Sequence, residues 1–398
     1  MDFAGFIDAA FKGSPALRAK FAEAGAGPAE VRTPEDLVKL PVTRKSELAA
    51  RQKEDVPFGG FLTVPVKTLQ RVFVSPGPIY DPQGPGEDYW GWQEALAAAG
   101  FGPGDVVQNT FSYHLTPAGM MFDGALRARG CVVVPAGVGN SELQLQVMRD
   151  LGVTGYIGVP SFLYVLLKKA DELGLTCPGD LKLQKAWVAA EKLSENLRAL
   201  LAERYGIAVF QGYGTADTGC VAYECEMRKG FHVASRAVLE IVDPEIGQPV
   251  PDGEAGEVVV TILDPVYPLV RFGTGDLGIA AAGSCPCGRA GKRLLGIYGR
   301  TSDGVKVRGL FIYPHQVAEL QARLRNVGPC RAVVTQTDFR DRLTLQIETP
   351  DAARVPDLKD RARALAKELL RLTVEVETVR PGTLSGSDKL IVDERSWK

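Results

Sequence analysis

The sequence predicts an α/β protein with a large N-terminal domain, residues 1–301, and a small, mobile α+β C-terminal domain, residues 302–398. The large domain is expected to hold mainly parallel βαβ sheets and a β-rich subdomain over about 221–300. Three observations support this prediction. Strand and helix patterns alternate between about 100 and 215, apolar runs between Gly and Pro turns follow, and a mixed tail ends the chain.

The first 65 residues read as helices and loops, because apolar residues recur at helical spacing and Pro interrupts the pattern. In the alternating region, strands separated by helices of this length form βαβ units, whose parallel sheet is covered on both faces. Ligands of such sheets bind beyond the carboxyl ends of the strands. The expected strands are 105–113, 131–137, 156–160, 185–191 and 207–214, and the expected helices are 119–130, 143–152, 161–174 and 194–206.

After residue 220 the alternation of strand and helix patterns gives way to strand patterns separated by turns. Apolar runs that alternate or continue between turns favour an antiparallel or barrel-like subdomain there. In the tail, strand patterns over 331–337 and 343–349 precede an amphipathic helix over 357–373. The leucine stripe of that helix is interpreted as core packing.

The composition argues against several classes of protein. The chain has 46 Lys and Arg against 48 Asp and Glu, a net charge of −2, so net charge does not draw it to nucleic acid or to a membrane surface. No apolar run approaches the roughly 18 residues of a spanning helix, and the N-terminus lacks a signal-peptide pattern. The seven Cys are scattered and do not resemble a disulfide framework. We expect a cytoplasmic protein that binds neither nucleic acid nor membranes.

Four stretches carry a resemblance to a known family. They are GYGTADTG at 212–219, RFGTGDLG at 271–278, GRTSDGVKVRGLFIYPHQVAEL at 299–320 and GTLSGSDKLIVDER at 382–395. In this order they resemble the motifs of the adenylate-forming enzymes, and within them the phenylacetate–CoA ligases. Supporting matches are LPVTRKSEL, AAEK, YECEMRKGFHV and CPCGR.

The resemblance implies an ATP- and Mg²⁺-dependent acid–CoA ligase. Such an enzyme activates a carboxylic acid as acyl-AMP, releases pyrophosphate and passes the acyl group to coenzyme A. Two alternatives stay open: transfer to a carrier-protein thiol or an amine, and a non-catalytic or weakly catalytic protein that binds a nucleotide or acyl group. The resemblance also suggests a homodimer.

The resemblance assigns a nucleotide site. Asp276 would accept hydrogen bonds from the ribose hydroxyls, Arg300 would reach the ribose or a phosphate, and Tyr213 would flank the adenine. Read without the family, the Gly-Asp pair at Asp276 is an ordinary turn. The other positions expected to contact the nucleotide are Ala190, Glu191, Gly212, Gly214 and Lys306.

The resemblance also assigns catalytic and hinge residues. Asp217 would hold Mg²⁺ against the ATP phosphates, although the same residue reads equally well as a helix N-cap. Lys389 would swing in with the small domain and stabilise the charge that develops during adenylation, whereas a single Lys is otherwise a solvated surface charge. The hinge falls on Ser302, with Asp303 beside it.

The phosphate loop of the family corresponds to SPGPIYDPQG at 75–84, which follows a short strand pattern and reads as a loop. The loop lacks Lys, its Pro residues remove N–H donors, and Asp81 would repel phosphate unless a metal ion intervenes. Ser75, the Gly77 backbone and the Tyr80 hydroxyl are the groups left to bind phosphate.

Aromatic residues near the predicted strand ends suggest an acyl pocket. Phe111, Tyr113, Tyr156 and Phe162 offer apolar walls with few charges, which favours an aryl or otherwise apolar acid, although each ring alone also reads as core. His114 is a further catalytic candidate, placed to touch the substrate carboxylate or a phosphate.

Two Cys/His pairs indicate a second, structural metal site. Cys225 with His232, and Cys285 with Cys287, lie on loops of the β-rich region and suit a tetrahedral Zn²⁺. Buried free thiols and a hydrogen-bonded His are the alternative interpretation.

Overall fold

The computed structural model describes residues 2–75, 78–281, 283–308, 310–325, 327–337, 340–350, 355–385 and 389–395. The chain forms two compact units, Met1–Ile297 and Tyr298–Lys398, so the division falls a few residues before the boundary expected after residue 301.

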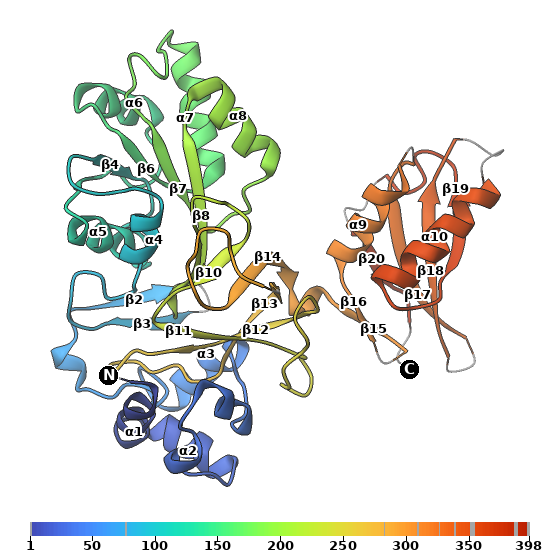
Figure 1. Ribbon diagram of the computed structural model, residues 1–398, viewed down its shortest axis with the longest axis horizontal. Coiled ribbons are helices and arrows are strands. Elements are labelled where there is room, and N and C mark those ends of the chain that lie inside the picture. Colours follow the sequence, from blue (N-terminus) through green and yellow to red (C-terminus); the bar gives the residue numbers. More distant parts are fainter. Residues whose placement is uncertain are drawn as a thin grey trace. The chain divides into compact units, whose positions relative to one another are not determined.

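The elements of the large unit are listed in chain order (Figure 1). They are α1 (Phe3–Gly13), α2 (Pro15–Glu23), β1 (Thr43–Arg44), α3 (Lys45–Glu54), β2 (Arg71–Ser75), β3 (Ile79–Gln83), α4 (Gln93–Ala98), β4 (Val106–Asn109), α5 (Ala118–Ala128), β5 (Val132–Pro135), α6 (Ser141–Asp150), β6 (Gly155–Gly158), α7 (Pro160–Glu172), β7 (Lys185–Val188), α8 (Glu195–Tyr205), β8 (Ala208–Thr215), β9 (Gly219–Glu224), β10 (Phe231–Val233), β11 (Ala237–Val242), β12 (Ala255–Ile262), β13 (Phe272–Ala280) and β14 (Arg293–Arg300).

One sheet runs through the large unit in the strand order β11-β12-β13-β14-β10-β9-β8-β7-β6-β4-β5. Neighbouring strands from β5 to β8 are parallel. The β8–β9, β9–β10, β11–β12 and β12–β13 pairs are antiparallel. The predicted α/β class is confirmed, but the parallel and β-rich regions are two parts of one sheet that meet at the β8–β9 pair.

Helices cover both faces of the parallel part, because alternate residues of each strand face opposite sides. Ile157 and Trp187 pack with helices α4 and α5 in one core cluster. Their neighbours Tyr156 and Ala186 pack with helices α6, α7 and α8 in another. None of the helices in the described ranges is long and apolar enough to cross a membrane.

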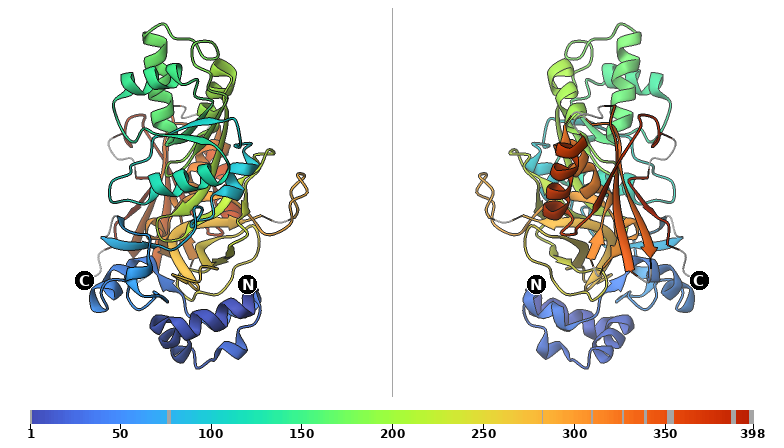
Figure 2. Two further views of the ribbon diagram at one scale, coloured as in Figure 1. Left: turned by 90° about the vertical axis from the view of Figure 1, so that its left-hand side faces the viewer. Right: turned by 90° about the vertical axis from the view of Figure 1, so that its right-hand side faces the viewer.

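Helices α1 and α2 lie against the β11–β13 end of the sheet (Figure 2). The Ser14 hydroxyl, between the two helices, accepts the Leu17 N–H at 3.2 Å and so caps α2. Strand β1 pairs with β13 in parallel and leads directly into α3. The first residue of α3 is therefore positioned by a strand of the main sheet.

The loop expected over residues 75–84 is largely a β-hairpin. β2 and β3 pair antiparallel, with Phe73 opposite Asp81 and Val72 opposite Pro82. Sequence reasoning missed β3 because Pro is rare in strands; a two-stranded ribbon tolerates it, since one edge of each strand needs no partner. The correction matters because strand alternation now fixes which side chains of this segment share a face.

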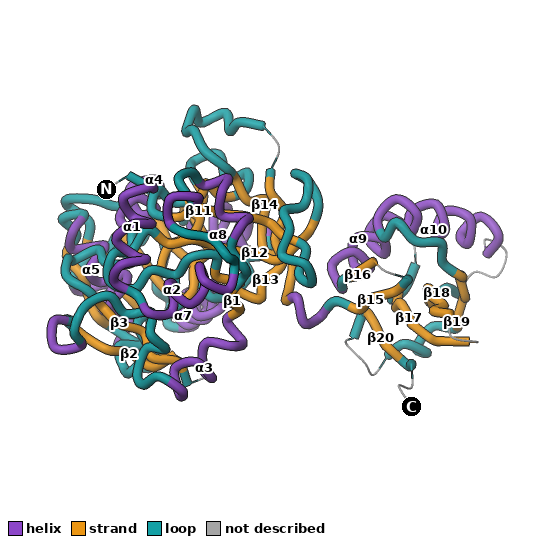
Figure 3. The backbone as a smooth tube through the Cα atoms, turned by 90° about the horizontal axis from the view of Figure 1, so that it is seen from below, coloured by secondary structure: helices purple, strands orange, loops and turns teal. Residues whose placement is uncertain are grey.

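The small unit has its own sheet, in the order β19-β18-β17-β20, and a separate β15–β16 hairpin. Helices α9 and α10 lie together on one side of the sheet (Figure 3). Leu358 and Ala362 of α10 are buried, so the leucine stripe packs in the core as predicted. The elements are β15 (Val305–Val307), β16 (Leu310–Ile312), α9 (Pro314–Leu324), β17 (Cys330–Thr337), β18 (Arg340–Glu348), α10 (Val355–Leu369), β19 (Glu375–Val379) and β20 (Ile391–Asp393).

Candidate functional site

Tyr213 on β8 and Asp276 on β13, both predicted nucleotide residues, meet in the large unit. The Tyr213 hydroxyl donates to Asp276 Oδ2 over 2.8 Å and lies 3.0 Å from Thr274 Oγ1. Strands β14, β10 and β9 separate β13 from β8 in the sheet order, and in a flat sheet this spacing would be roughly 19 Å. The sheet therefore curls strongly, and this curl brings the β13 carboxylate to the end of β8.

Gly275 shapes the backbone just before this carboxylate. Its φ is 76°, a left-handed conformation that strains other residues, and its N–H donates to Glu257 Oε1 over 3.2 Å. Glu257 is buried and also pairs with Arg44, 3.7 Å away, in the segment that leads into α3. Asp276 therefore sits on a backbone turn held by a buried carboxylate.

Gly212 and Gly214 have a packing role in this structure. A Cβ at Gly212 would lie 2.5 Å from the Trp187 ring, and one at Gly214 would lie 2.1 Å from the Gly219 carbonyl oxygen. Real Cβ atoms do not approach neighbours this closely. These glycines let β8 pack against Trp187 and β9, which explains their presence without a ligand.

Asp217, the predicted magnesium ligand, follows β8 and pairs with Lys45, the first residue of α3. The Lys45 ammonium lies 2.5 Å from Asp217 Oδ2, and the Thr215 hydroxyl donates to the same oxygen over 3.1 Å. The Asp217 side chain is fully buried. LPVTRKSEL matches the family, but a role for Lys45 cannot be predicted from this stretch, because only the fold shows that it reaches β8.

Asp81 of the β2–β3 hairpin is a second buried carboxylate close to Asp217. Asp81 is 2% exposed, and among the described residues neither of its oxygens has a hydrogen-bond partner of good geometry. Burial, reinforced by the charge of Asp217, raises the pKa of Asp81 to about 8, and weak hydrogen bonds from Ser75 together with the charge of Lys45 only partly offset this. Asp217 Oδ1 and the Ser75 hydroxyl are also buried, and they too lack a well-aligned partner in the described part of the chain. This set of hard oxygen donors fits Mg²⁺, which prefers carboxylate and hydroxyl ligands.

The other predicted residues of the phosphate segment are placed differently. Tyr80 is 41% exposed, because it alternates with the buried Asp81 along β3. The Gln52 side chain clamps the Tyr80 backbone, accepting its N–H at 2.8 Å and donating to its carbonyl oxygen at 2.9 Å. Gly77 lies outside the described residues.

Ala190 and Glu191 follow β7, where the resemblance placed nucleotide contacts. Ala190 has φ 68°, a left-handed conformation that costs a residue with a Cβ about 1 kcal/mol. Glu191 Oε2 accepts the N–H of Ser161 at 3.3 Å, in the first turn of α7. Glu191 therefore contacts a helix N-terminus, where its charge is favourable.

The predicted acyl-pocket residues do not share one environment. Phe111 is buried and stacks on Phe122, with ring centroids 5.1 Å apart, in the α4–α5 cluster. Tyr156 is fully buried in the α6–α8 cluster, and its hydroxyl donates to the Val159 carbonyl oxygen over 3.0 Å. Phe162 is half-buried and packs against this second cluster. Phe111 and Tyr156 therefore pack in core clusters, as expected if each ring is read as part of the core.

Tyr113 and His114 lie in the segment between β4 and α5. The Tyr113 hydroxyl accepts from Asn109 Nδ2 at 2.9 Å and donates to Asp123 Oδ2 at 3.2 Å. His114 is exposed. The next residue, Leu115, accepts the N–H of Val74 at 2.9 Å, so this segment lies beside the β2–β3 hairpin that carries Asp81.

The predicted residues from the hinge onward lie in the small unit. Arg300 ends β14, and its N–H donates to Asp303 Oδ2 over 3.2 Å. The Lys306 ammonium lies 5.7 Å from the centre of the Phe311 ring. The full set is Arg300, Ser302, Asp303, Lys306 and Lys389, all exposed.

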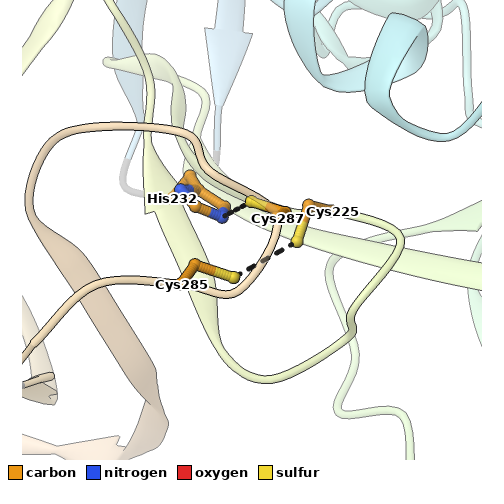
Figure 4. Close-up of side chains that lie close together, drawn as sticks. All are labelled: Cys225, His232, Cys285 and Cys287. Carbon is orange, nitrogen blue, oxygen red and sulfur yellow. Dashed lines mark hydrogen bonds between the residues drawn. The ribbon is translucent and has the colours of Figure 1, made fainter.

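Cys225, His232, Cys285 and Cys287 converge in the large unit, as Figure 4 shows. Their ligand atoms all lie within 4.8 Å of one another. Cys225 Sγ is 3.8 Å from Cys285 Sγ, and Cys287 Sγ is 3.3 Å from His232 Nε2. Zinc–sulfur bonds of about 2.3 Å in a tetrahedron place two sulfurs about 3.8 Å apart, so the spacing fits Zn²⁺.

The chemistry of these thiols also suits a metal. Although desolvation opposes ionisation, hydrogen bonds from Arg289 lower the pKa of Cys287 to about 7. Burial raises the pKa of Cys225 to about 11. The two values reflect an environment with one readily ionised sulfur and one buried sulfur that a cation would help to ionise.

Comparisons with known proteins agree with this architecture. Residues 89–261 match the family model of AMP-binding enzymes. The phenylacetate–coenzyme A ligase of Thermus thermophilus is 31% identical over 94% of this chain and 90% of its own length. That of Pseudomonas putida is 32% identical over 80% of this chain and 73% of its own length. A solved structure of 2-hydroxyisobutyryl-CoA ligase, in an open conformation with 2-HIB-AMP and CoA, superposes with a TM-score of 0.83 at 25% identity, covering 98% of this chain and 90% of that one.

Proposed function

The chain belongs to the phenylacetate–CoA ligase family of AMP-binding enzymes, and from this premise we propose that it is an ATP-dependent acid–CoA ligase. The acid carboxylate attacks the α-phosphorus of ATP, which forms acyl-AMP and releases pyrophosphate. The thiol of coenzyme A then attacks the acyl carbon, and AMP leaves. Each step forms one bond and breaks one bond without an external oxidant.

The observation that carries this proposal is the meeting of Tyr213 with Asp276 near the end of β8. A carboxylate beside a left-handed glycine can accept both ribose hydroxyls of a nucleotide, because the backbone leaves room for the ligand. The Tyr213 hydroxyl fixes the orientation of this carboxylate before the nucleotide binds. Tyr213 is therefore a positioning residue as well as a wall of the adenine site.

The positive charge of Lys45 is proposed to replace the Lys that the phosphate segment lacks. Its ammonium is held by Asp217 within a largely buried environment, where electrostatic interactions are stronger than in water. Pyrophosphate leaves with additional negative charge, and Lys45 is placed to stabilise it. Lys389, Arg300 and Lys306 are proposed to act from the small domain, which turns at Ser302 and Asp303.

Mg²⁺ would be held by Asp217 at this site. When bound, it would neutralise charge on the ATP phosphates and favour departure of pyrophosphate. The unpartnered Oδ1 of Asp217 is the atom that supports this assignment.

Zn²⁺ is proposed to be structural, held by Cys225, His232, Cys285 and Cys287. The four ligands leave no open position in a tetrahedral site, which is the pattern of structural zinc. The ion would tie the segment between β13 and β14 to β9 and β10.

The substrate is proposed to be an aryl or apolar acid. Tyr113 and His114 lie beside the hairpin at the phosphate site, so the acyl group of the adenylate would run toward the segment between β4 and α5. An acid of this class gains free energy by leaving water for such a surface.

Pyrophosphate release tests the proposal. Purified protein with ATP and Mg²⁺ is given a panel of phenylacetic, benzoic and short branched acids, and acyl-CoA is measured by mass spectrometry after coenzyme A is added. At least one acid should stimulate both pyrophosphate release and thioester formation. If no acid stimulates release while ATP still raises the melting temperature, the protein is a nucleotide-binding protein and the proposal fails.

We also propose that the protein acts in the cytoplasm and forms a homodimer. Sedimentation equilibrium of the purified chain tests the homodimer directly. A single species of monomer mass at micromolar concentration would refute it.

A further inference from the structure

The β2–β3 hairpin and the end of β8 place unpartnered oxygens together in a buried environment. Within the described ranges, both carboxylate oxygens of Asp81, one oxygen of Asp217 and the Ser75 hydroxyl lack well-aligned hydrogen-bond partners. Asp81 and Ser75 are 2% and 4% exposed. A buried polar atom without a partner costs about 1–3 kcal/mol, and a buried charge costs more, so this arrangement is stable only if something else satisfies it.

The surrounding charges identify what is missing. Lys45 contacts Asp217 but makes no hydrogen bond with Asp81 among the described contacts, so two carboxylates share one ammonium. When both are ionised, one negative charge is left uncompensated. Tyr267 lies close enough to both carboxylates that their charges, after burial, raise its pKa, so this phenol remains neutral. The positive charge of Lys45 acts on Asp81 as well as on Asp217.

Hydrogen bonds from α3 fix the backbone beside Asp81. Gln52 fixes the backbone of the adjacent Tyr80 with two hydrogen bonds and also donates to the Tyr267 hydroxyl over 3.2 Å. Gln52 lies two turns after Lys45 on α3, so one face of the helix positions both the hairpin and the ammonium. Strand alternation then points Asp81 away from the exposed Tyr80.

We infer that Asp81 is a second carboxylate ligand of the divalent cation held by Asp217, and that the Ser75 hydroxyl completes the protein's share of the coordination. The inference rests on the proposed function only in taking the phosphates that the cation would bind to be those of ATP. When both carboxylates are ionised, a bound divalent cation changes the summed charge of Asp81, Asp217 and Lys45 from −1 to +1. An acidic residue in the phosphate segment then favours phosphate binding through the metal, instead of repelling it.

Manganese binding tests the inference without any turnover. Mn²⁺ replaces Mg²⁺ at oxygen sites, and free Mn²⁺ is measured by its electron paramagnetic resonance signal during titration of the protein, with and without AMP. Asp81→Asn keeps the side-chain shape and removes the charge. Asp105→Asn is the matched control, because Asp105 is a partly buried aspartate paired with Lys185 at 3.0 Å, outside this site.

The wild-type chain should bind Mn²⁺, Asp81→Asn should weaken binding at least tenfold, and Asp105→Asn should leave it unchanged. Ser75→Ala should weaken binding several-fold, which tests the same site without altering Asp81. In EDTA, Asp81→Asn should melt at the same temperature as the wild type or higher, because it removes a buried acidic group that lies beside Asp217. Equal Mn²⁺ affinity of wild type and Asp81→Asn overturns the inference, as does a wild-type chain that binds no Mn²⁺.

The two proposals fail separately. If Asp81→Asn binds Mn²⁺ like the wild type while acids still stimulate pyrophosphate release, the inference is wrong and the function stands. If Mn²⁺ binding depends on Asp81 while no acid is activated, the metal site stands and the function is wrong.

Discussion

Lys45 and Asp217 are 172 positions apart in the sequence, and their charged atoms meet at 2.5 Å. The contact joins α3, at the N-terminal end of the large unit, to the segment that follows β8. A buried carboxylate that loses its ammonium partner becomes strongly unfavourable, so each residue constrains the other.

Lys45→Gln should lower the rate of pyrophosphate release at least tenfold, about 1.4 kcal/mol of transition-state stabilisation. The variant removes the ammonium near the leaving phosphates and leaves Asp217 beside Asp81 without a counter-charge. Binding of AMP, which lacks these phosphates, should change little by calorimetry. Lys53→Gln is the control, because Lys53 is exposed near the end of the same helix. An equal loss of AMP binding would show that Lys45 maintains the fold rather than the reaction.

Tyr213→Phe should weaken AMP binding by roughly tenfold. The ring stays, but Asp276 loses the hydroxyl that orients it, and a hydrogen bond to a charged group contributes about 1.5 kcal/mol. Isothermal titration calorimetry measures the effect. Tyr205→Phe is the control. Tyr205, on α8, donates its hydroxyl to Asp171 over 2.7 Å, and loss of this comparable contact should leave AMP binding unchanged. Unaltered affinity in Tyr213→Phe would contradict the positioning role.

Cys285→Ser should abolish stoichiometric zinc in the purified protein and lower the melting temperature by roughly 5 °C, since about 2 °C corresponds to 1 kcal/mol in a domain of this size. Elemental analysis and thermal denaturation give the two readouts. Cys177→Ser, a free thiol outside the cluster, should change neither. Wild-type protein without zinc, after purification free of chelators, would disprove the site.

Lys20→Met should reduce the pH dependence of stability. Burial, reinforced by the Arg271 charge, lowers the pKa of Lys20 from 10.5 to about 7. Between these values the unfolded chain binds more protons than the folded chain, so the free energy of unfolding rises with pH and falls as pH is lowered toward 7. Urea denaturation between pH 7 and pH 10 should show a slope lower than that of the wild type by up to about 1.4 kcal/mol per pH unit. Lys12→Met, on the exposed side of α1, is the control. If the free energy of unfolding has the same pH dependence in Lys20→Met as in the wild type, the pKa of Lys20 is not lowered in the folded protein.

The fold was largely predictable from local patterns. Alternating strands and helices between 100 and 215 satisfy their backbone hydrogen bonds in one way, as a covered parallel sheet, so the pattern alone predicts it. The β2–β3 hairpin was not predictable in this way. Pro82 lowers the strand propensity of its segment, and only pairing with Val72 across the ribbon makes this segment a strand.

The candidate site was predictable where short motifs carry the chemistry. Asp276, Asp217 and the Cys/His pairs stand in recognisable stretches. Lys45 and the burial of Asp81 depend on how β1 and the hairpin meet the main sheet, which no local pattern encodes. Phe111 and Tyr156 show the converse limit, because an aromatic residue at a strand end reads the same whether it lines a pocket or fills a core.

The position of α3 has a practical consequence for engineering. A truncated version of the large unit that begins after residue 55 would keep the whole βαβ region and the motif strand β8, and would look complete by its signature sequences. It would lack the ammonium at Asp217 and the amide clamp that holds the hairpin. Truncated variants, chimeras and domain grafts of this chain should therefore keep the N-terminal helices together with the nucleotide-binding core.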